Sequence, residues 1–168
     1  MKRMLWAVPV ILAAAAVLGS EAQAQSSTTP QDLDVSITIT NSCTVSIASP
    51  IAFGSQGSLA TAVTATGTID VNCTTDHPYD IALDAGEGVG ATTETRLMTG
   101  PESATITYSL FKDDQHAEVW GDDTVEDTTK AGIGTGQAES HTVYGRIAAQ
   151  TTPPAGAYSD SVAVVVHY

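Results

Sequence analysis

The sequence is poor in positive charge, in aromatic side chains and in cysteine. Its 168 residues include 6 Lys and Arg against 19 Asp and Glu, which gives a formal net charge of −13. Because nucleic acids and anionic lipids are bound by cationic surfaces, this balance argues against both as partners. Charged residues make up only 15% of the chain and hydrophobic residues 42%, so the composition is that of a protein with a core rather than of a disordered acidic chain.

No apolar stretch in the N-terminal region is long enough to cross a bilayer comfortably. The run from Leu5 to Leu18 has 14 residues, whereas a membrane-spanning helix needs about 20. It follows the basic residues Lys2 and Arg3 and precedes Ala22-Gln23-Ala24, which fits a cleavage site. We therefore expect residues 1–24 to be a secretory signal peptide and expect no membrane insertion of the mature chain.

The expected export would bring the two cysteines, Cys43 and Cys73, into an oxidising compartment. In an oxidising compartment a disulfide between them is the default. A metal site is the weaker alternative, because it would need histidine partners and because two lone cysteines 30 residues apart lack the usual ligand spacing.

No segment shows a sustained apolar period of 3.6 residues, so the sequence gives no sign of amphipathic helices. Alternation with a period of two is common instead, in a chain with 24 threonines. The clearest expected strands are 33–40, 63–73, 106–111 and 161–168, and shorter ones are 44–47, 79–83, 118–120 and 141–148. Turn-rich stretches such as 84–90 and 121–136 separate them. Seven or eight short strands in one domain are typical of a β-sandwich.

The two ends of the mature chain are unusual. The first expected strand, Leu33–Thr40, is joined to Cys43 by only two residues, and the last strand runs up to Tyr168. A last strand with an alternating apolar face is normally paired on both edges. If the sandwich lacks one strand, the missing neighbour must come from elsewhere, and the chain carries a spare strand at its opposite end. A hairpin between Leu33–Thr40 and Thr44–Ile47 is the alternative, since two-residue links do form hairpins.

Two C-terminal segments carry a recognisable pattern. Val143–Ile147 reads V-Y-G-R-I, and Pro154–Val162 fits P-A-G-x-Y-x-D-x-V. Both resemble the spore coat protein U domain family, which includes the pilins of archaic chaperone–usher pili. Further features fall in the order that this family shows: Cys43, Phe53-Gly54, Cys73, Arg96-Leu97-Met98, Tyr108, Trp120-Gly121 and the glycines at 132, 134 and 136. The resemblance covers roughly residues 35–168.

The resemblance implies an all-β fold, namely an incomplete Ig-like β-sandwich that is completed by a donor strand from a neighbouring subunit. Residues 25–41 would be the N-terminal donor-strand extension and residues 42–168 the pilin domain. The donor side chains would be Leu33, Val35, Ile37 and Ile39. The acceptor groove would lie beside the last strand, with one wall made by Val162, Val164, Val166 and Tyr168, and a chaperone strand would cover this wall in the periplasm.

The expected function is that of a structural subunit of a secreted chaperone–usher pilus at the cell surface, which supports adhesion or biofilm formation. Its expected partners are a periplasmic pilus chaperone, an outer-membrane usher and identical or related pilins. The alternatives are a monomeric secreted surface or spore coat protein that acts as a binding module, and a small secreted hydrolase.

The sequence offers no local signal for catalysis or for a bound ion. The four histidines are dispersed, and neither H-E-x-x-H nor G-x-S-x-G occurs. The acidic stretch 121–130 lacks the ligand order of an EF-hand, so it reads as a solvated loop. We therefore predict no enzyme activity, no cofactor and no metal.

Overall fold

The computed structural model describes residues 28–122 and 128–168. The expected signal peptide, residues 1–24, and the middle of the acidic stretch lie outside the described residues. Within them the regular structure consists of eight β-strands and one short 3₁₀ turn, η1 (Pro101–Ser103), which confirms the all-β class. No described helix is long and apolar enough to span a membrane.

The chain divides into an N-terminal segment up to Ile37 and a body from Thr38 to Tyr168. Residues 28–42 form no strand, although the sequence pattern favours one over Leu33–Thr40. An extended segment is a strand only when a neighbour takes up its backbone hydrogen bonds. Its alternating apolar side chains are instead largely exposed: Leu33 by 87%, Val35 by 88%, Ile37 by 85% and Ile39 by 72%.

One sheet of the body has five antiparallel strands. Their spatial order is β1 (Cys43–Ser49), β2 (Val63–Cys73), β7 (Ala138–Ile147), β5 (Thr105–Phe111) and β4 (Arg96–Thr99). β2 and β7 form its centre, with ten residues of β2 in register with β7. β1 pairs with β2 alone and is therefore an edge strand.

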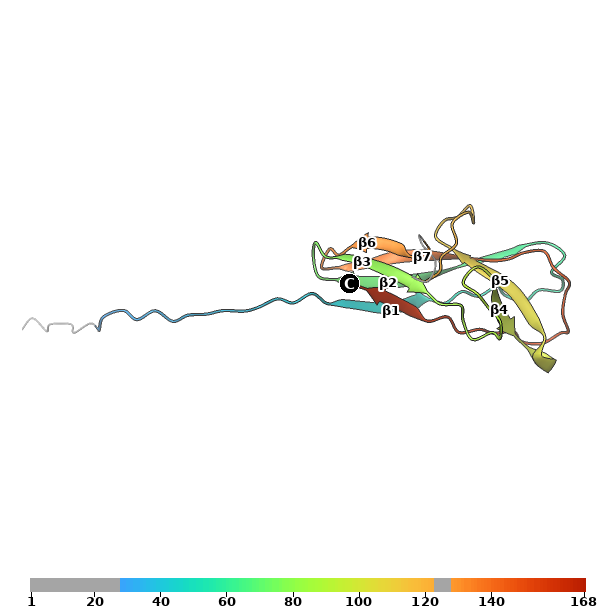
Figure 1. The fold of residues 1–168 in the computed structure, drawn as a ribbon, viewed down its shortest axis with the longest axis horizontal. Coiled ribbons are helices and arrows are strands. Elements are labelled where there is room, and N and C mark those ends of the chain that lie inside the picture. Colours follow the sequence, from blue (N-terminus) through green and yellow to red (C-terminus); the bar gives the residue numbers. More distant parts are fainter. Residues whose placement is uncertain (1–27, 123–127) are drawn as a thin grey trace, which may run out of the picture. The chain divides into compact units, whose positions relative to one another are not determined.

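The second sheet has three antiparallel strands, β6 (Lys130–Ile133), β3 (Pro78–Leu83) and β8 (Val164–His167). β8 is at the edge of this sheet and pairs only with β3. In Figure 1 the edge strands β1 and β8, one from each sheet, lie next to each other. Each of them is paired on one side only, and we call the space between their unpaired edges the gap.

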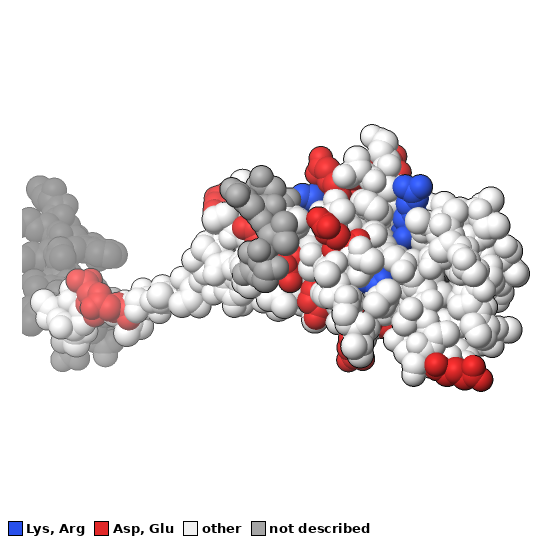
Figure 2. Space-filling view, turned by 45° about the vertical axis from the view of Figure 1, so that its right-hand side comes forward, with Lys and Arg blue, Asp and Glu red and all other residues white. Residues whose placement is uncertain are grey.

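The core lies between the two sheets and consists of the inward side chains of the alternating strands. Val71, Ile81 and Trp120 have no exposed surface. The indole nitrogen Nε1 of Trp120 donates a hydrogen bond of 2.9 Å to the carbonyl oxygen of Ile81. On the face of the body shown in Figure 2, acidic side chains are spread widely and basic ones form a few small patches.

The sequence pattern was wrong about some strands. The segment Glu118–Trp120 makes only a single bridge, between Val119 and Phe111, and the Trp120 side chain is buried in the core. β4 was not predicted, and β6 lies in a stretch read as turns. Both have four residues, too few to show a period of two clearly. The last strand is also shorter than expected.

Candidate functional site: an open groove between the edge strands

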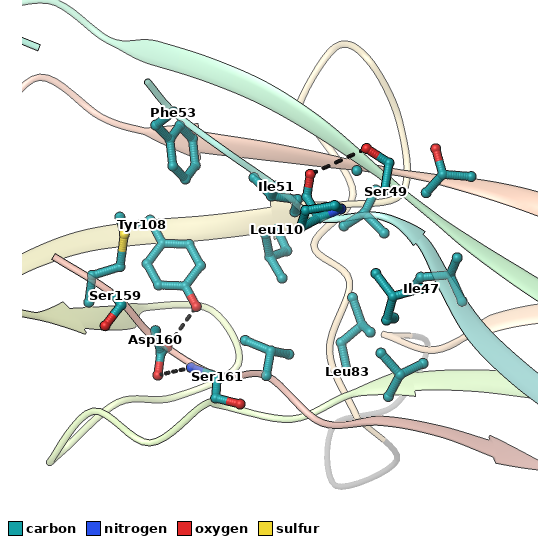
Figure 3. A pocket seen from close by; sticks show the side chains of 18 of the residues that line it. Ile47, Ser49, Ile51, Phe53, Leu83, Tyr108, Leu110, Ser159, Asp160 and Ser161 are labelled. Carbon is teal, nitrogen blue, oxygen red and sulfur yellow. Dashed lines mark hydrogen bonds between the residues drawn. The ribbon is translucent and has the colours of Figure 1, made fainter. Parts of the chain in front are cut away.

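The body contains an apolar groove of about 400 Å³ that opens between β1 and β8 (Figure 3). One side is formed by the end of β1 and the segment after it, and the other by the segment that leads into β8. The floor is made of core residues from both sheets. The lining residues include Ile47, Ile51 and Phe53 on one side, Tyr158, Val162 and Val164 on the other, and Leu83, Tyr108, Leu110 and Val143 on the floor.

The β1 side of the groove exposes apolar side chains. Val45 is 39% exposed and Ile47 is 55% exposed, whereas Ile69, which is paired with Ile47 in β2, is 3% exposed. These β1 side chains alternate as in a strand of a sandwich, but the described residues leave them partly exposed. Apolar side chains at this edge of the larger sheet are therefore exposed to water, at a position where a β-sandwich normally has buried core residues.

The backbone of both edge strands is directed toward the gap. The amide of Asp84 donates to the carbonyl of Ala163, which fixes the phase of the β3–β8 ladder. Because antiparallel pairs alternate, the amide and carbonyl groups of Val164 and Val166 then face away from β3. The bond from the Thr74 amide to the Ser42 carbonyl fixes the phase of the β1–β2 ladder in the same way. In that ladder the backbone amide and carbonyl of Val45 face away from β2, toward the gap. The groove thus has the backbone edges that an added strand requires.

The segment before β8 is anchored by two carboxylates. Asp160 accepts hydrogen bonds from the Tyr108 hydroxyl at 2.6 Å, the Glu87 amide at 2.8 Å and the Ser161 amide at 2.9 Å. Asp84 accepts one from the Ala163 amide at 2.9 Å. Burial, together with the bond to Asp160, raises the pKa of Tyr108, so the hydroxyl, which is already protonated at neutral pH, stays a hydrogen-bond donor further into the alkaline range. These contacts hold the groove wall in place without help from an occupant.

Two glycines shape the opposite side. A Cβ on Gly67 would lie 2.7 Å from Cγ1 of Ile51, and a Cβ on Gly145 would lie 2.9 Å from Cζ of Phe53. The segment after β1 can therefore lie directly on the β2–β7 sheet only because these two positions lack side chains. This accounts for the glycine in the V-Y-G-R-I segment.

The predicted acceptor residues have different positions in the structure. Val162 and Val164 line the groove. Val166 packs against the core further along β8, and Tyr168 is 59% exposed, with its ring 6.3 Å from that of His77. The open cavity is thus at the start of β8 rather than along its whole length.

The alternation of apolar residues gives no indication of the two non-strand segments that line the groove, Pro50–Phe53 and Tyr158–Ser161. The sequence feature that points to these segments is the presence of both Phe53-Gly54 and the residues Tyr158 and Asp160 of the P-A-G-x-Y-x-D-x-V pattern. Among the described residues no group of three or more His, Cys, Asp or Glu side chains could hold a metal ion.

The expected disulfide between Cys43 and Cys73 is present and joins the first residue of β1 to the last residue of β2, with a Cα–Cα distance of 4.1 Å. The alternative of a metal site at these two cysteines is therefore wrong, because both sulfur atoms are in the disulfide. Because Cys43 begins β1, which borders the groove, the disulfide holds this edge of the groove on β2 of the five-stranded sheet.

We expect the double variant Cys43→Ser/Cys73→Ser to be less stable by about 3–4 kcal/mol, because the unfolded chain regains the freedom of a loop of about 30 residues. Urea unfolding followed by fluorescence measures this difference. The wild type in a reducing agent should behave like the variant, and the variant should not respond to the agent. Equal urea midpoints for oxidised and reduced wild type would contradict the prediction.

The family model described as Spore Coat Protein U domain matches residues 29–165. Among solved structures, the chain is similar to the crystal structure of the CsuC–CsuE chaperone–tip adhesion subunit pre-assembly complex from archaic chaperone–usher Csu pili of Acinetobacter baumannii, with a TM-score of 0.57 and 22% identity. The match covers 78% of this chain and 40% of the matched chain in that complex, so this chain spans about two-fifths of the length of the matched chain. No curated protein matches.

Proposed function

Because the chain belongs to the spore coat protein U domain family, which includes the pilins of archaic chaperone–usher pili, we propose that it is a structural subunit of such a pilus. One observation carries this proposal. The sandwich has a groove that opens its core between two edge strands, and the same chain carries an exposed segment with four alternating apolar side chains. The groove and the segment have the two complementary forms that strand addition between polypeptides requires.

In the proposed assembly, Leu33, Val35, Ile37 and Ile39 of one subunit enter the groove of the next. Their backbone would bond to the open edges of β1 and β8, and their side chains would cover the floor of the groove. Val162, Val164, Val166 and Tyr168 belong to the acceptor side, with Val162 and Val164 closest to the cavity. Residues 25–41 are then the donor extension, and residues 42–168 the acceptor body.

Donation to a neighbour is favoured over self-completion by the shortness of the link between the donor segment and the body. The two residues Asn41 and Ser42 span at most about 7 Å, so the segment cannot readily turn back to lie beside β8. Donation from chain to chain is heterologous and does not close on itself, and it therefore produces filaments.

Before assembly, an open edge beside an apolar groove is an aggregation hazard. We propose that a periplasmic pilus chaperone covers it with a strand of its own, and that an outer-membrane usher exchanges the chaperone for the next subunit. The structurally similar protein was crystallised in a chaperone–subunit pre-assembly complex, which supports this order. The assembled fibre would be exposed at the cell surface and serve adhesion or biofilm formation.

Size-exclusion chromatography of the purified mature chain tests the proposal. We expect a concentration-dependent series of multimers, or aggregation, in the absence of a chaperone, because each molecule offers both a groove and a donor. We expect a single heterodimer when a matching chaperone is co-expressed. A monomer that stays stable alone at high concentration would support the binding-module alternative instead.

A further inference from the structure

The chain has two asparagines, and they lie in different surroundings. Asn41 is outside the strands, is exposed and is followed by Ser42, whose small side chain leaves room around its own backbone nitrogen. Asn72 lies within β2, where it is paired with Thr44 on one side and with Ala138 on the other. The backbone of Asn72 is therefore held by two neighbouring strands, whereas that of Asn41 is held by other contacts.

Asparagine is one of the thermolabile residues, because its side-chain amide can be lost without an enzyme. The backbone nitrogen of the next residue gives up its proton to a base from the solvent and forms a bond to Cγ of the asparagine. The bond between Cγ and Nδ2 then breaks, and ammonia leaves. Water opens the resulting succinimide ring either at Cγ, which gives aspartate, or at the backbone carbonyl carbon, which gives isoaspartate. The net reaction consumes water and releases ammonia.

At Asn41 the nitrogen that would attack is that of Ser42, and its proton is already in use. The Ser42 amide donates a hydrogen bond of 3.0 Å to Oγ1 of Thr74. A hydroxyl oxygen accepts such a bond through a lone pair and still has its own proton to donate. The Thr74 hydroxyl lies within donating distance of the carbonyls of Ser42, at 3.3 Å, and Thr40, at 3.5 Å. One side chain thus contacts the peptide groups on both sides of Asn41.

These contacts oppose ring closure at Asn41 in two ways. The Ser42 nitrogen must lose the proton that it shares with Thr74, so their hydrogen bond has to break first. The nitrogen must also approach Cγ of Asn41, and because the peptide group is planar, it cannot turn unless the whole peptide turns. The following carbonyl, that of Ser42, is held by the Thr74 amide at 2.9 Å. The fold therefore restrains both the proton and the position of the reacting nitrogen.

The backbone that carries Thr74 is itself fixed by the loop that follows β6. The Gly136 amide donates to the Cys73 carbonyl at 3.0 Å, and the Asp76 amide donates to the Gly134 carbonyl at 2.8 Å. A Cβ on Gly134 would collide with the carbonyl oxygen of Thr74, so only glycine allows the loop to lie so close. The Thr74 hydroxyl therefore has a defined position in the folded body.

We infer that Asn41 is the site at which this protein deamidates, and that the Thr74 hydroxyl slows the reaction by holding the Ser42 amide. The inference concerns the single chain and does not depend on the proposed function. Deamidation at Asn41 adds a negative charge to a chain that is already acidic, and isoaspartate adds a carbon atom to the backbone shortly before β1. The contacts of Thr74 thus preserve the length and charge of the link between the N-terminal segment and the body.

Peptide mass spectrometry of the purified, folded chain after incubation at mildly alkaline pH tests the inference. Thr74→Val keeps the side-chain shape and removes the hydroxyl, so deamidation at Asn41 should be faster by roughly two- to twelvefold, which corresponds to the loss of one hydrogen bond. Thr74→Ser keeps the hydroxyl and should react at the wild-type rate. Ser42→Pro has no N–H to lose and should not deamidate at Asn41. Asn72 is the internal control and should stay unmodified throughout.

The same incubation in urea separates the effect of the fold from that of the sequence. There the wild type and Thr74→Val should deamidate at Asn41 at one common, higher rate, because the unfolded chain lacks the contact between Ser42 and Thr74. Equal rates for these two proteins in the folded state would overturn the role of Thr74. A rise at both asparagines in folded Thr74→Val would trace the effect to the whole fold and overturn the local role. Faster deamidation at Asn72 than at Asn41 in the folded wild type would overturn the site.

Discussion

The variant Ile37→Asp is expected to form no polymers, although its body still folds. Ile37 is 85% exposed in the single chain, so the substitution removes no contact within the folded body. In a neighbour's groove the same side chain would be buried, and burial of an isoleucine contributes roughly 1.5–3 kcal/mol. An unpaired carboxylate in that position adds a large desolvation cost. A loss of about 4 kcal/mol or more corresponds to roughly a thousandfold weaker association. Val35→Asp should behave in the same way.

The matched control is Thr38→Asp, which places the same charge one residue away on the opposite face of the donor strand. It should polymerise, because this face would remain in water. The Ile37→Asp subunit keeps an intact groove, so adding it to the purified wild type should shorten the multimers, because it accepts the free donor segment at one end and donates to no further subunit. Multimer length by size-exclusion and electron microscopy measures both effects. Normal fibres from Ile37→Asp alone would show that the donor assignment is wrong.

The second large effect is expected at Arg96, which has no exposed surface. Its guanidinium donates to four backbone carbonyls: Nε to Asp84 at 2.7 Å, Nη1 to Thr93 at 2.6 Å, and Nη2 to Leu83 and Trp120 at 2.9 Å each. Arg96 is in β4 of the larger sheet and Leu83 is in β3 of the smaller one. The side chain therefore joins the two sheets.

Replacement of Arg96 by methionine should prevent stable folding. Burial lowers the pKa of Arg96, but the group remains protonated and its carbonyl partners depend on it. Each hydrogen bond to a charged group contributes about 1.5–3 kcal/mol, and buried carbonyls without partners add a further penalty. The total approaches the 5–15 kcal/mol that stabilises a typical domain.

The yield of soluble chain–chaperone complex and its urea midpoint measure the effect of Arg96→Met. Arg146→Met is the control, because Arg146 is exposed on β7 and its loss should change stability by less than about 0.5 kcal/mol. If Arg96→Met and Arg146→Met gave equal yields and midpoints, Arg96 would not be the connection between the sheets that its contacts indicate.

Five of the strands were predictable from a period of two in the sequence, whereas Leu33–Thr40 has the same period and forms no strand, because no neighbour pairs with it. β2 was expected over residues 63–73 and has these bounds, and β1, β3, β5 and β7 differ from expectation only at their ends. Local alternation is enough to identify such strands because each one has a face in the core and a face in water.

The groove and its supports could be predicted only in part. The role of Arg96 depends on carbonyls up to 24 residues away, and Asp160 accepts a bond from Tyr108, 52 residues before it. Neither residue type signals burial by itself, since arginine and aspartate are usually exposed. The position of the cavity depends on how Ile51 and Phe53 pack over Gly67 and Gly145, which no local pattern reveals.

The placement of the disulfide has a mechanical consequence for the proposed fibre. A pulling force on the donor segment reaches its own body at Cys43, which is covalently joined to β2, a strand paired on both sides. Tension therefore passes directly into the centre of the larger sheet. The hydrogen bonds between β1 and β2 are not opened one after another from the end, and the neighbouring groove edge keeps its shape while the fibre is stretched.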